Sequence, residues 1–268
     1  MNTQYKYITH RSEMVLGKEV MNAISKINVI IFGIGGVGSW CAESLVRTGV
    51  LNLTIVDSDI ICPTNINRQA EATSLNIGNS KVEEMKNRLV AINRDARIQA
   101  IHAAFDIKTS ESFDLGSYDY VIDAIDSLQN KILLLEQCVK TNTTVYSSMG
   151  AGARSDPSMI RTDLIRKTAN CPLARRVRKM LREKNVTSDI ICVYSDEIPV
   201  SPAVDTLCGT GECVCVHDRN RFCSENDVES IDWCSKKKQV NGALVHITAI
   251  FGFMLASLII KNVQDKIK

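Results

Sequence analysis

The chain has 268 residues, 45% of them hydrophobic and 23% charged, which is the balance of a protein that buries an ordinary core. Its formal net charge at pH 7 is only +2, so binding of nucleic acid through the surface as a whole is excluded and any basic patch must be local. The length allows one large α/β domain or two small ones.

The first residues and the cysteines bear on where the protein works. The first six residues are polar and lack the apolar centre of a signal peptide, so we expect a cytoplasmic protein whose ten cysteines are reduced thiols. The apolar run from Leu244 to Ile260 is shorter than the ~20 residues that span a bilayer, and it contains His246. We therefore expect a core helix there, with a membrane anchor as the weaker alternative.

Strand-like and helix-like segments alternate along the first half of the chain, which indicates βαβ units and a parallel sheet. Ser80 and Glu83 have the spacing of a capping box at the start of one helix. We expect a single domain, residues 1–268, with an irregular loop or insertion at about 200–238. The predicted strands lie near 27–33, 52–57, 97–102, 119–123, 143–147, 158–164 and 189–194, and the predicted helices near 37–48, 80–92, 128–140 and 172–184.

A glycine-rich turn connects the first predicted strand to the following helix. This strand–turn–helix context is typical of a phosphate-binding turn, because glycines allow a tight turn and let the backbone approach phosphates. The helix N-terminus adds free N–H groups and a favourable dipole. Asp57 ends the next strand, where a ribose-binding acid is expected. The sequence therefore predicts nucleotide binding at Gly33, Gly35, Gly36 and Gly38.

Further polar residues follow the strands whose carboxyl ends should meet at the same edge of a parallel sheet, where ligands collect. Two cations and several acids exceed what NAD needs, and they suit a triphosphate with Mg²⁺. Each residue alone could be a solvated charge or a helix cap, but the whole set on one edge favours a binding site. The set is Asp57, Asp59, Asn65, Arg68, Lys81, Asp123 and Asp126.

In order and spacing, these residues resemble the superfamily of ubiquitin-activating-enzyme-like adenylating proteins, which includes ThiF, MoeB and HesA. The resemblance implies a Rossmann-like parallel or mixed sheet flanked by helices, the α/β adenylating-enzyme fold. It also implies a homodimer in which an arginine from the N-terminal segment, here Arg11, reaches across the interface. The matching residues are the stretch from Gly33 to Ser39, Asp57-Ser58-Asp59, Asn65-Ile66-Asn67-Arg68-Gln69, Lys81 and Asp126.

The resemblance also implies roles for individual residues in ATP binding. Asp57 would hold the ribose, and Asn65, Arg68 and Lys81 would reach the phosphates. Asp126 would bind Mg²⁺. Arg68, Lys81, Asp126 and Arg11 are the residues that would promote the reaction.

The second half of the chain resembles the branch of the superfamily that dehydrates threonylcarbamoyladenosine in tRNA. That resemblance implies an ATP-dependent reaction through an acyl-adenylate, which closes to a cyclic hydantoin. Cys171 departs from the branch, which usually has Asp before Pro-Leu-Ala. The matching stretches are 149–157, 161–164, 167–168, 172–178, 191–195 and 251–253.

A local basic region fits an RNA substrate. Between Arg161 and Lys184 there are nine Lys or Arg and two Asp or Glu, a local charge of 9 − 2 = +7. We expect Leu173, Val177 and Met180 to form the buried face of this helix, and the basic residues to point outward and follow phosphates. A solvated amphipathic helix is the alternative. The predicted RNA contacts are Arg175, Arg176, Arg178, Lys179 and Arg182.

A late segment is rich in cysteine and contains His217. It could hold a structural zinc, but it lacks paired CxxC motifs, so zinc has weak support and free thiols or an oxidised pair are the alternatives. The cysteines are Cys208, Cys213, Cys215, Cys223 and Cys234.

Three other functions remain open. An adenylyltransferase that activates the C-terminal glycine of a ubiquitin-like sulfur carrier would use the same ATP site, but usually has the CxxC pairs missing here. An NAD-dependent oxidoreductase explains the glycine turn but not Arg68, Lys81 and Asp126 together. The intact polar set disfavours a non-catalytic RNA- or protein-binding scaffold. Sulfur or redox partner proteins also stay open.

Overall fold

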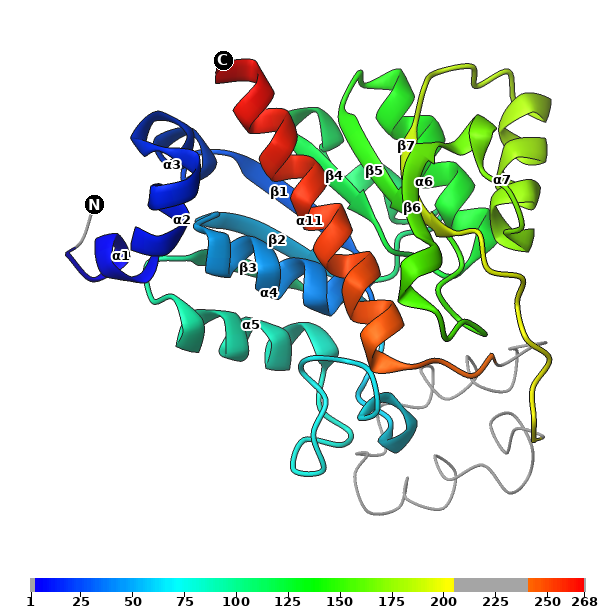
Figure 1. Ribbon diagram of the computed structural model, residues 1–268, viewed down its shortest axis with the longest axis horizontal. Helices are drawn as coiled ribbons and strands as arrows, with labels where there is room; N and C mark the ends of the chain where they lie inside the picture. Colours follow the sequence, from blue (N-terminus) through cyan, green and yellow to red (C-terminus); the bar gives the residue numbers. More distant parts are fainter. Residues whose placement is uncertain (1–2, 205–240, 268) are drawn as a thin grey trace.

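A seven-stranded sheet forms the centre of the computed structural model, which describes residues 3–204 and 241–267 (Figure 1). The strand order is β3-β2-β1-β4-β5-β7-β6, and all neighbours are parallel except β6 and β7. The predicted α/β class with a parallel or mixed sheet is confirmed. The strands are β1 (Asn28–Phe32), β2 (Asn52–Val56), β3 (Arg97–Ile101), β4 (Tyr120–Asp123), β5 (Thr144–Ser148), β6 (Ile160–Leu164) and β7 (Ile191–Ser195).

Helices cover both faces of the sheet (Figure 1). Alternate residues of β1 face opposite sides: Val29 and Ile31 join the core under α3, α4, α5 and α11, whereas Ile30 and Phe32 join the core under α6 and α7. The helices are α1 (Thr3–Ile8), α2 (His10–Leu16), α3 (Lys18–Ile24), α4 (Gly38–Thr48), α5 (Lys81–Ile92), α6 (Leu128–Lys140), α7 (Pro172–Glu183) and α11 (Val245–Ile267).

The C-terminal helix α11 crosses the sheet beside α4. Its buried residues Ile247, Phe251, Leu255 and Ile259 recur every fourth position and form one stripe against the core. A Cβ added at Gly252 would lie 2.5 Å from the Val37 carbonyl oxygen, so the glycine lets α11 rest directly on the start of α4. By length and composition α11 could cross a membrane, and 44% of its apolar window is buried in the protein. The expected core helix is supported by its buried stripe, which belongs to the core on this face of the sheet.

One local prediction is wrong. Helix α5 begins at Lys81 as expected, but the Ser80 side chain makes no capping hydrogen bond. Instead, Ser80 Oγ lies 2.8 Å from Nδ1 of His102, which follows β3. The imidazole therefore engages the hydroxyl that the capping box requires. Of the predicted irregular segment at about 200–238, residues 205–238 lie outside the described residues.

Candidate functional site

The glycine turn joins β1 to α4 at the carboxyl edge of the sheet. Gly33 has φ +92°, and a Cβ there would lie 2.7 Å from the Ala124 carbonyl oxygen. A Cβ at Gly38 would lie 1.8 Å from the Gly33 carbonyl oxygen. Only glycine fits both positions, so the turn brings the N-terminus of α4 close to the loop after β4.

Asp57 fixes the turn from the neighbouring strand. Its Oδ2 accepts a hydrogen bond from the Ile34 N–H at 2.6 Å, and its Oδ1 accepts one from the Asp59 N–H at 2.8 Å. Burial raises the pKa of Asp57, and the positive charge of Lys81 opposes that rise. The predicted ribose-binding acid is therefore held rigidly at the end of β2.

Lys81 is a buried cation at the first position of α5. Its Nζ lies 2.8 Å from Asp59 Oδ2, and the residue is only 5% exposed. Burial lowers the pKa of Lys81, but Asp57 and Asp59 together raise it above its usual range. Lys81 therefore carries its charge in a fixed position at the same edge as Asp57.

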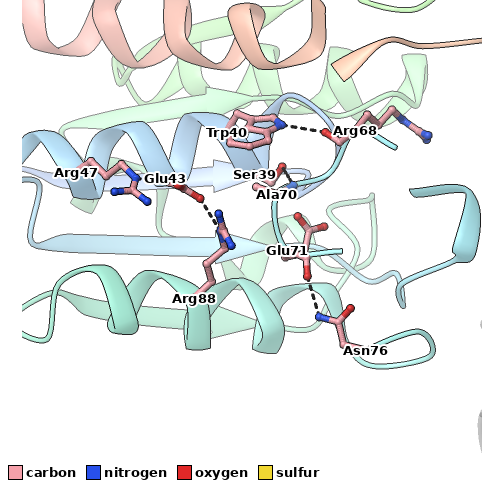
Figure 2. A network of polar contacts seen from close by, with 9 residues as sticks. All are labelled: Ser39, Trp40, Glu43, Arg47, Arg68, Ala70, Glu71, Asn76 and Arg88. Atoms are coloured by element: carbon pink, nitrogen blue, oxygen red, sulfur yellow. Dashed lines mark hydrogen bonds and ion pairs between the residues drawn. The ribbon is translucent and has the colours of Figure 1, made fainter. Parts of the chain in front are cut away.

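The loop after β2 carries Asn65 and Arg68. Asn65 is buried, and its Oδ1 accepts a hydrogen bond from the Cys62 N–H at 3.0 Å, so this end of the side chain organises the loop. Arg68 Nη1 donates to the Thr64 carbonyl oxygen at 2.7 Å. The Arg68 carbonyl oxygen accepts from Trp40 Nε1 of α4 at 2.9 Å (Figure 2). The loop is thus attached to the helix that the glycine turn begins.

The two predicted acids near the end of β4 differ in their exposure to solvent. Asp123 is fully buried, where its Oδ2 lies 2.6 Å from Lys131 Nζ and accepts a 2.5 Å hydrogen bond from Ser147 Oγ. The expectation that Asp123 contacts the nucleotide directly therefore needs correction, because its carboxylate is enclosed by these partners. Asp126 is exposed three residues later, in the loop whose backbone faces Gly33.

Lys131 is a residue of this edge that the sequence analysis missed. It is 0% exposed, and its Nζ also donates to the Ser148 carbonyl oxygen at 3.0 Å, so it ties β4 to β5. The available signal was its helical spacing. Lys131 shares the apolar face of α6 with Leu134, Leu135 and Cys138, all of which are buried.

The predicted N-terminal arginine does not join this site within one chain. Arg11 is exposed on α2, and α2 lies at the far end of the sheet from the loops that carry the glycine turn (Figure 1). A role for Arg11 at the site therefore requires a second copy of the chain.

Helix α7 presents a basic face, with one exception. Arg175, Arg176, Lys179 and Arg182 are exposed as predicted. Arg178 instead turns back on the protein, where its Nη1 donates to the Thr168 carbonyl oxygen at 2.8 Å and contacts Thr168 Oγ1. The prediction that Arg178 points outward is therefore wrong.

The buried side of α7 also differs from the predicted face. Ala174, Val177 and Leu181 are its buried residues, whereas Leu173 and Met180 are only partly buried. The apolar face is therefore rotated slightly about the helix axis.

Cys171 occupies the N-cap of α7, and its side chain makes no capping hydrogen bond. Beside it lies Arg154, which is 3% exposed and contacts the Ala153 and Asn170 carbonyl oxygens only at 3.5 Å. Arg154 Nε has no hydrogen-bond partner among the described residues. Burial lowers the pKa of Arg154, an effect that Cys171 and Glu197 oppose.

The predicted core cysteine lies within the described part of the chain, whereas the predicted zinc ligands do not. Cys192 is fully buried in β7, as expected of a core residue, and burial raises the pKa of its thiol above the usual range. Across residues 3–204 and 241–267, no group of three His, Cys, Asp or Glu side chains could hold a metal ion. The predicted zinc candidates, namely Cys208, Cys213, Cys215, Cys223, Cys234 and His217, lie outside these ranges.

An open sheet of order 3-2-1-4-5, a glycine turn between β1 and α4, and charges at the carboxyl ends of the strands together define a nucleotide-binding α/β protein. The chain belongs to the ThiF family, which it matches over residues 9–268.

The chain is similar along most of its length to tRNA threonylcarbamoyladenosine dehydratases. The enzyme of Bacillus subtilis (strain 168) is 37% identical over 190 residues, which cover 71% of this chain and 75% of the relative. That of Escherichia coli (strain K12) is 31% identical over 258 residues, which cover 93% and 91%. The crystal structure of E. coli TcdA in complex with ATP superposes with a TM-score of 0.83 at 28% identity, covering 99% of this chain and 97% of that one.

Proposed function

We propose that this protein is an ATP-dependent dehydratase that cyclises threonylcarbamoyladenosine in tRNA. The observation that carries the proposal is the similarity to tRNA threonylcarbamoyladenosine dehydratases. This similarity covers both the edge of the sheet that carries the glycine turn and the half of the chain that contains α7. The solved complexes of E. coli TcdA with AMP and with ATP support the choice of nucleotide. No observation on the described residues favours a sulfur-carrier adenylyltransferase or an NAD enzyme over this function.

The proposed reaction has two steps, an adenylation and a ring closure. A threonyl carboxylate oxygen attacks the α-phosphorus of ATP, the bond to the bridging oxygen breaks, and pyrophosphate leaves. The carbamoyl nitrogen then attacks the acyl carbon and loses its proton, AMP leaves with the former carboxylate oxygen, and the ring closes. The substrate has thereby lost one water.

The residues at the sheet edge supply position and charge for the first step. Lys81, fixed by Asp59, and Arg68 would neutralise charge that develops on the phosphates, and a preorganised cation costs no reorganisation during the reaction. The α4 N-terminus supplies backbone N–H groups to the phosphates. Asp57, whose carboxylate is held by the Ile34 N–H, would accept a hydrogen bond from a ribose hydroxyl.

The loop after β4 would hold the magnesium ion through Asp126. Asp126 is exposed beside the glycine turn, and Mg²⁺ is commonly held by one or two carboxylates together with substrate phosphates. When bound, the ion would neutralise charge on the departing pyrophosphate. Asp123, enclosed by Lys131 and Ser147, would keep this loop in place rather than contact the ion.

Two exposed surfaces, on α7 and on α2, would bind the tRNA and a second subunit. The exposed basic residues of α7 would follow tRNA phosphates. Arg11, exposed on α2, would complete the site of a second subunit in a homodimer. The expected place of action is the cytoplasm, where tRNA substrates are found.

The proposal is tested by the release of AMP and pyrophosphate from ATP. Release is expected with tRNA that carries threonylcarbamoyladenosine and not with the same tRNA lacking that modification. Equal release with both tRNAs, or release only with a small carrier protein that ends in glycine, would overturn the proposal.

A further inference from the structure

A buried carboxyl group with no hydrogen-bond partner lies at the foot of the glycine turn. Glu71 is 3% exposed, and neither of its carboxylate oxygens has a hydrogen-bond partner among the described residues. Burying an ionised carboxylate without partners is costly, and such groups usually respond by taking up a proton. Neither step of the proposed reaction uses this group.

The backbone around Glu71 is fixed, so the side chain is held in place. The preceding residue, Ala70, donates its N–H to Ser39 Oγ of α4 at 3.1 Å. Asn76 Nδ2 donates to the Glu71 carbonyl oxygen at 2.8 Å. Figure 2 shows Glu71 between these two attachments, beside the start of α4. These two hydrogen bonds fix the backbone on both sides of the Glu71 side chain.

The charged groups around Glu71 belong to the nucleotide site. Lys81 approaches from α5 and Asp57 from the end of β2, while α4 contributes the neutral hydroxyl of Ser39. The Lys81 ammonium is already paired with Asp59 at 2.8 Å. Three carboxyl groups therefore surround one ammonium, and a bound triphosphate would add further negative charge to the same cluster.

Burial is the main reason that the pKa of Glu71 is raised to about 8; the charge of Asp57 adds to the rise, whereas the Glu71 backbone N–H, the charge of Lys81 and the Ser39 hydroxyl oppose it. Phosphates drawn to Lys81 would stabilise the neutral acid still more, because they repel the carboxylate and compete with it for the ammonium.

We propose that Glu71 is the proton-binding group of the nucleotide site: its carboxylate takes up a proton from solvent when phosphates bind beside Lys81. The inference rests on the proposed function only in placing a nucleotide at the glycine turn. It assigns Glu71 a positioning role, because the neutral acid leaves Lys81 to the phosphates, whereas the carboxylate draws Lys81 away. Nucleotide affinity should therefore fall about tenfold per pH unit between the pKa of Glu71 in the free protein and its higher pKa in the complex.

Calorimetry of nucleotide binding tests the proposal directly. The full chain is titrated with α,β-methylene ATP, which cannot be cleaved at the reacting bond, in buffers of different ionisation enthalpy. At about pH 8.5 the wild type should take up between about half a proton and one proton per nucleotide, and the uptake should shrink towards about pH 6.5. The triphosphate is fully ionised at the higher pH and contributes no uptake of its own.

Two variants separate Glu71 from its surroundings. Glu71→Gln keeps the shape of the side chain and should bind the analogue without this uptake and with a flatter pH dependence. Glu83→Gln, which removes an exposed glutamate from the first turn of α5, should behave as the wild type. Glu71→Met provides a second neutral side chain if the glutamine variant does not fold.

Equal proton uptake in the wild type and in a neutral Glu71 variant would overturn the inference while leaving nucleotide binding intact. Uptake near zero in the wild type at about pH 8.5 would overturn it as well. Failure of the wild type to bind the analogue at any pH would instead contradict the proposed function.

Discussion

At the scale of single residues, two buried lysines organise the edge of the sheet. Lys81 pairs with Asp59 at the proposed nucleotide site, whereas Lys131 pairs with Asp123 at the end of β4. Asp57 could be predicted from the sequence because it follows a strand end, and Lys81 because it begins a predicted helix at the same edge of the sheet. Lys131 could have been found from its place on the apolar face of α6, whereas the burial of Glu71 depends on packing between elements far apart in the chain.

Lys131→Met is expected to destabilise the protein by about 3–5 kcal/mol, because it leaves the Asp123 carboxylate buried without its cation. Urea unfolding measures the loss. Adding Asp123→Asn should recover much of it, since the neutral amide keeps an acceptor for the Ser147 hydroxyl. A double variant less stable than Lys131→Met would show that the pair is not the source of the effect.

At the scale of elements, the sequence predicted the strands and most helices closely, because their apolar periodicity reflects two-sided burial. It did not predict α1, α2 or α3, and it was wrong about the phase of α7 and the capping of α5. Leu173 and Met180 have the expected spacing but are only partly buried, because Ala174 and Leu181 complete the buried face with Val177. His102 follows β3, 22 residues from Ser80 along the chain, so its contact with Ser80 leaves no local signal.

The N-cap of α7 offers a stability test. Cys171→Asp should stabilise the protein by about 1 kcal/mol, because a carboxylate can accept the free N–H groups of the first turn and lies beside the partly unsatisfied Arg154 guanidinium. Thermal or urea unfolding provides the measurement, and Cys171→Ser is the neutral comparison. A carboxylate variant less stable than the serine variant would contradict this account of the cap.

The exposed face of α7 offers a binding test. The double variant Arg175→Ala and Arg176→Ala should weaken tRNA binding and make it less salt-dependent, with the slope of log affinity against log salt falling by about one for each lost phosphate contact. Filter binding over a salt series measures this slope. Arg178→Ala should mainly lower the melting temperature, because its guanidinium holds the Thr168 carbonyl oxygen. An unchanged slope in the double variant would show that Arg175 and Arg176 of α7 do not contact tRNA phosphates.

At the scale of the whole molecule, the two faces of the sheet are covered by different helices. The stripe of α11 fixes the start of α4, and with it the glycine turn, while the opposite face carries α6 and the basic helix α7 (Figure 1). The apolar run predicted α11 itself, but its docking on α4 through Gly252 is a tertiary contact that no single segment encodes.

Assembly can be tested by mixing variants. Arg68→Ala should lower turnover about 10²- to 10³-fold by removing charge from the phosphates, and Arg11→Ala should act similarly if it serves the partner subunit. A heterodimer of the two variants has one site with both arginines, so mixing them should restore activity. Mixtures no more active than the separate variants would exclude a shared site.

The most direct test of the central claim is mass spectrometry of nucleosides from tRNA incubated with the protein and ATP. The proposed function predicts that threonylcarbamoyladenosine loses one water, and that an ¹⁸O label in its threonyl carboxylate appears in AMP. Unchanged threonylcarbamoyladenosine, or water loss without ATP and without label in AMP, would contradict it.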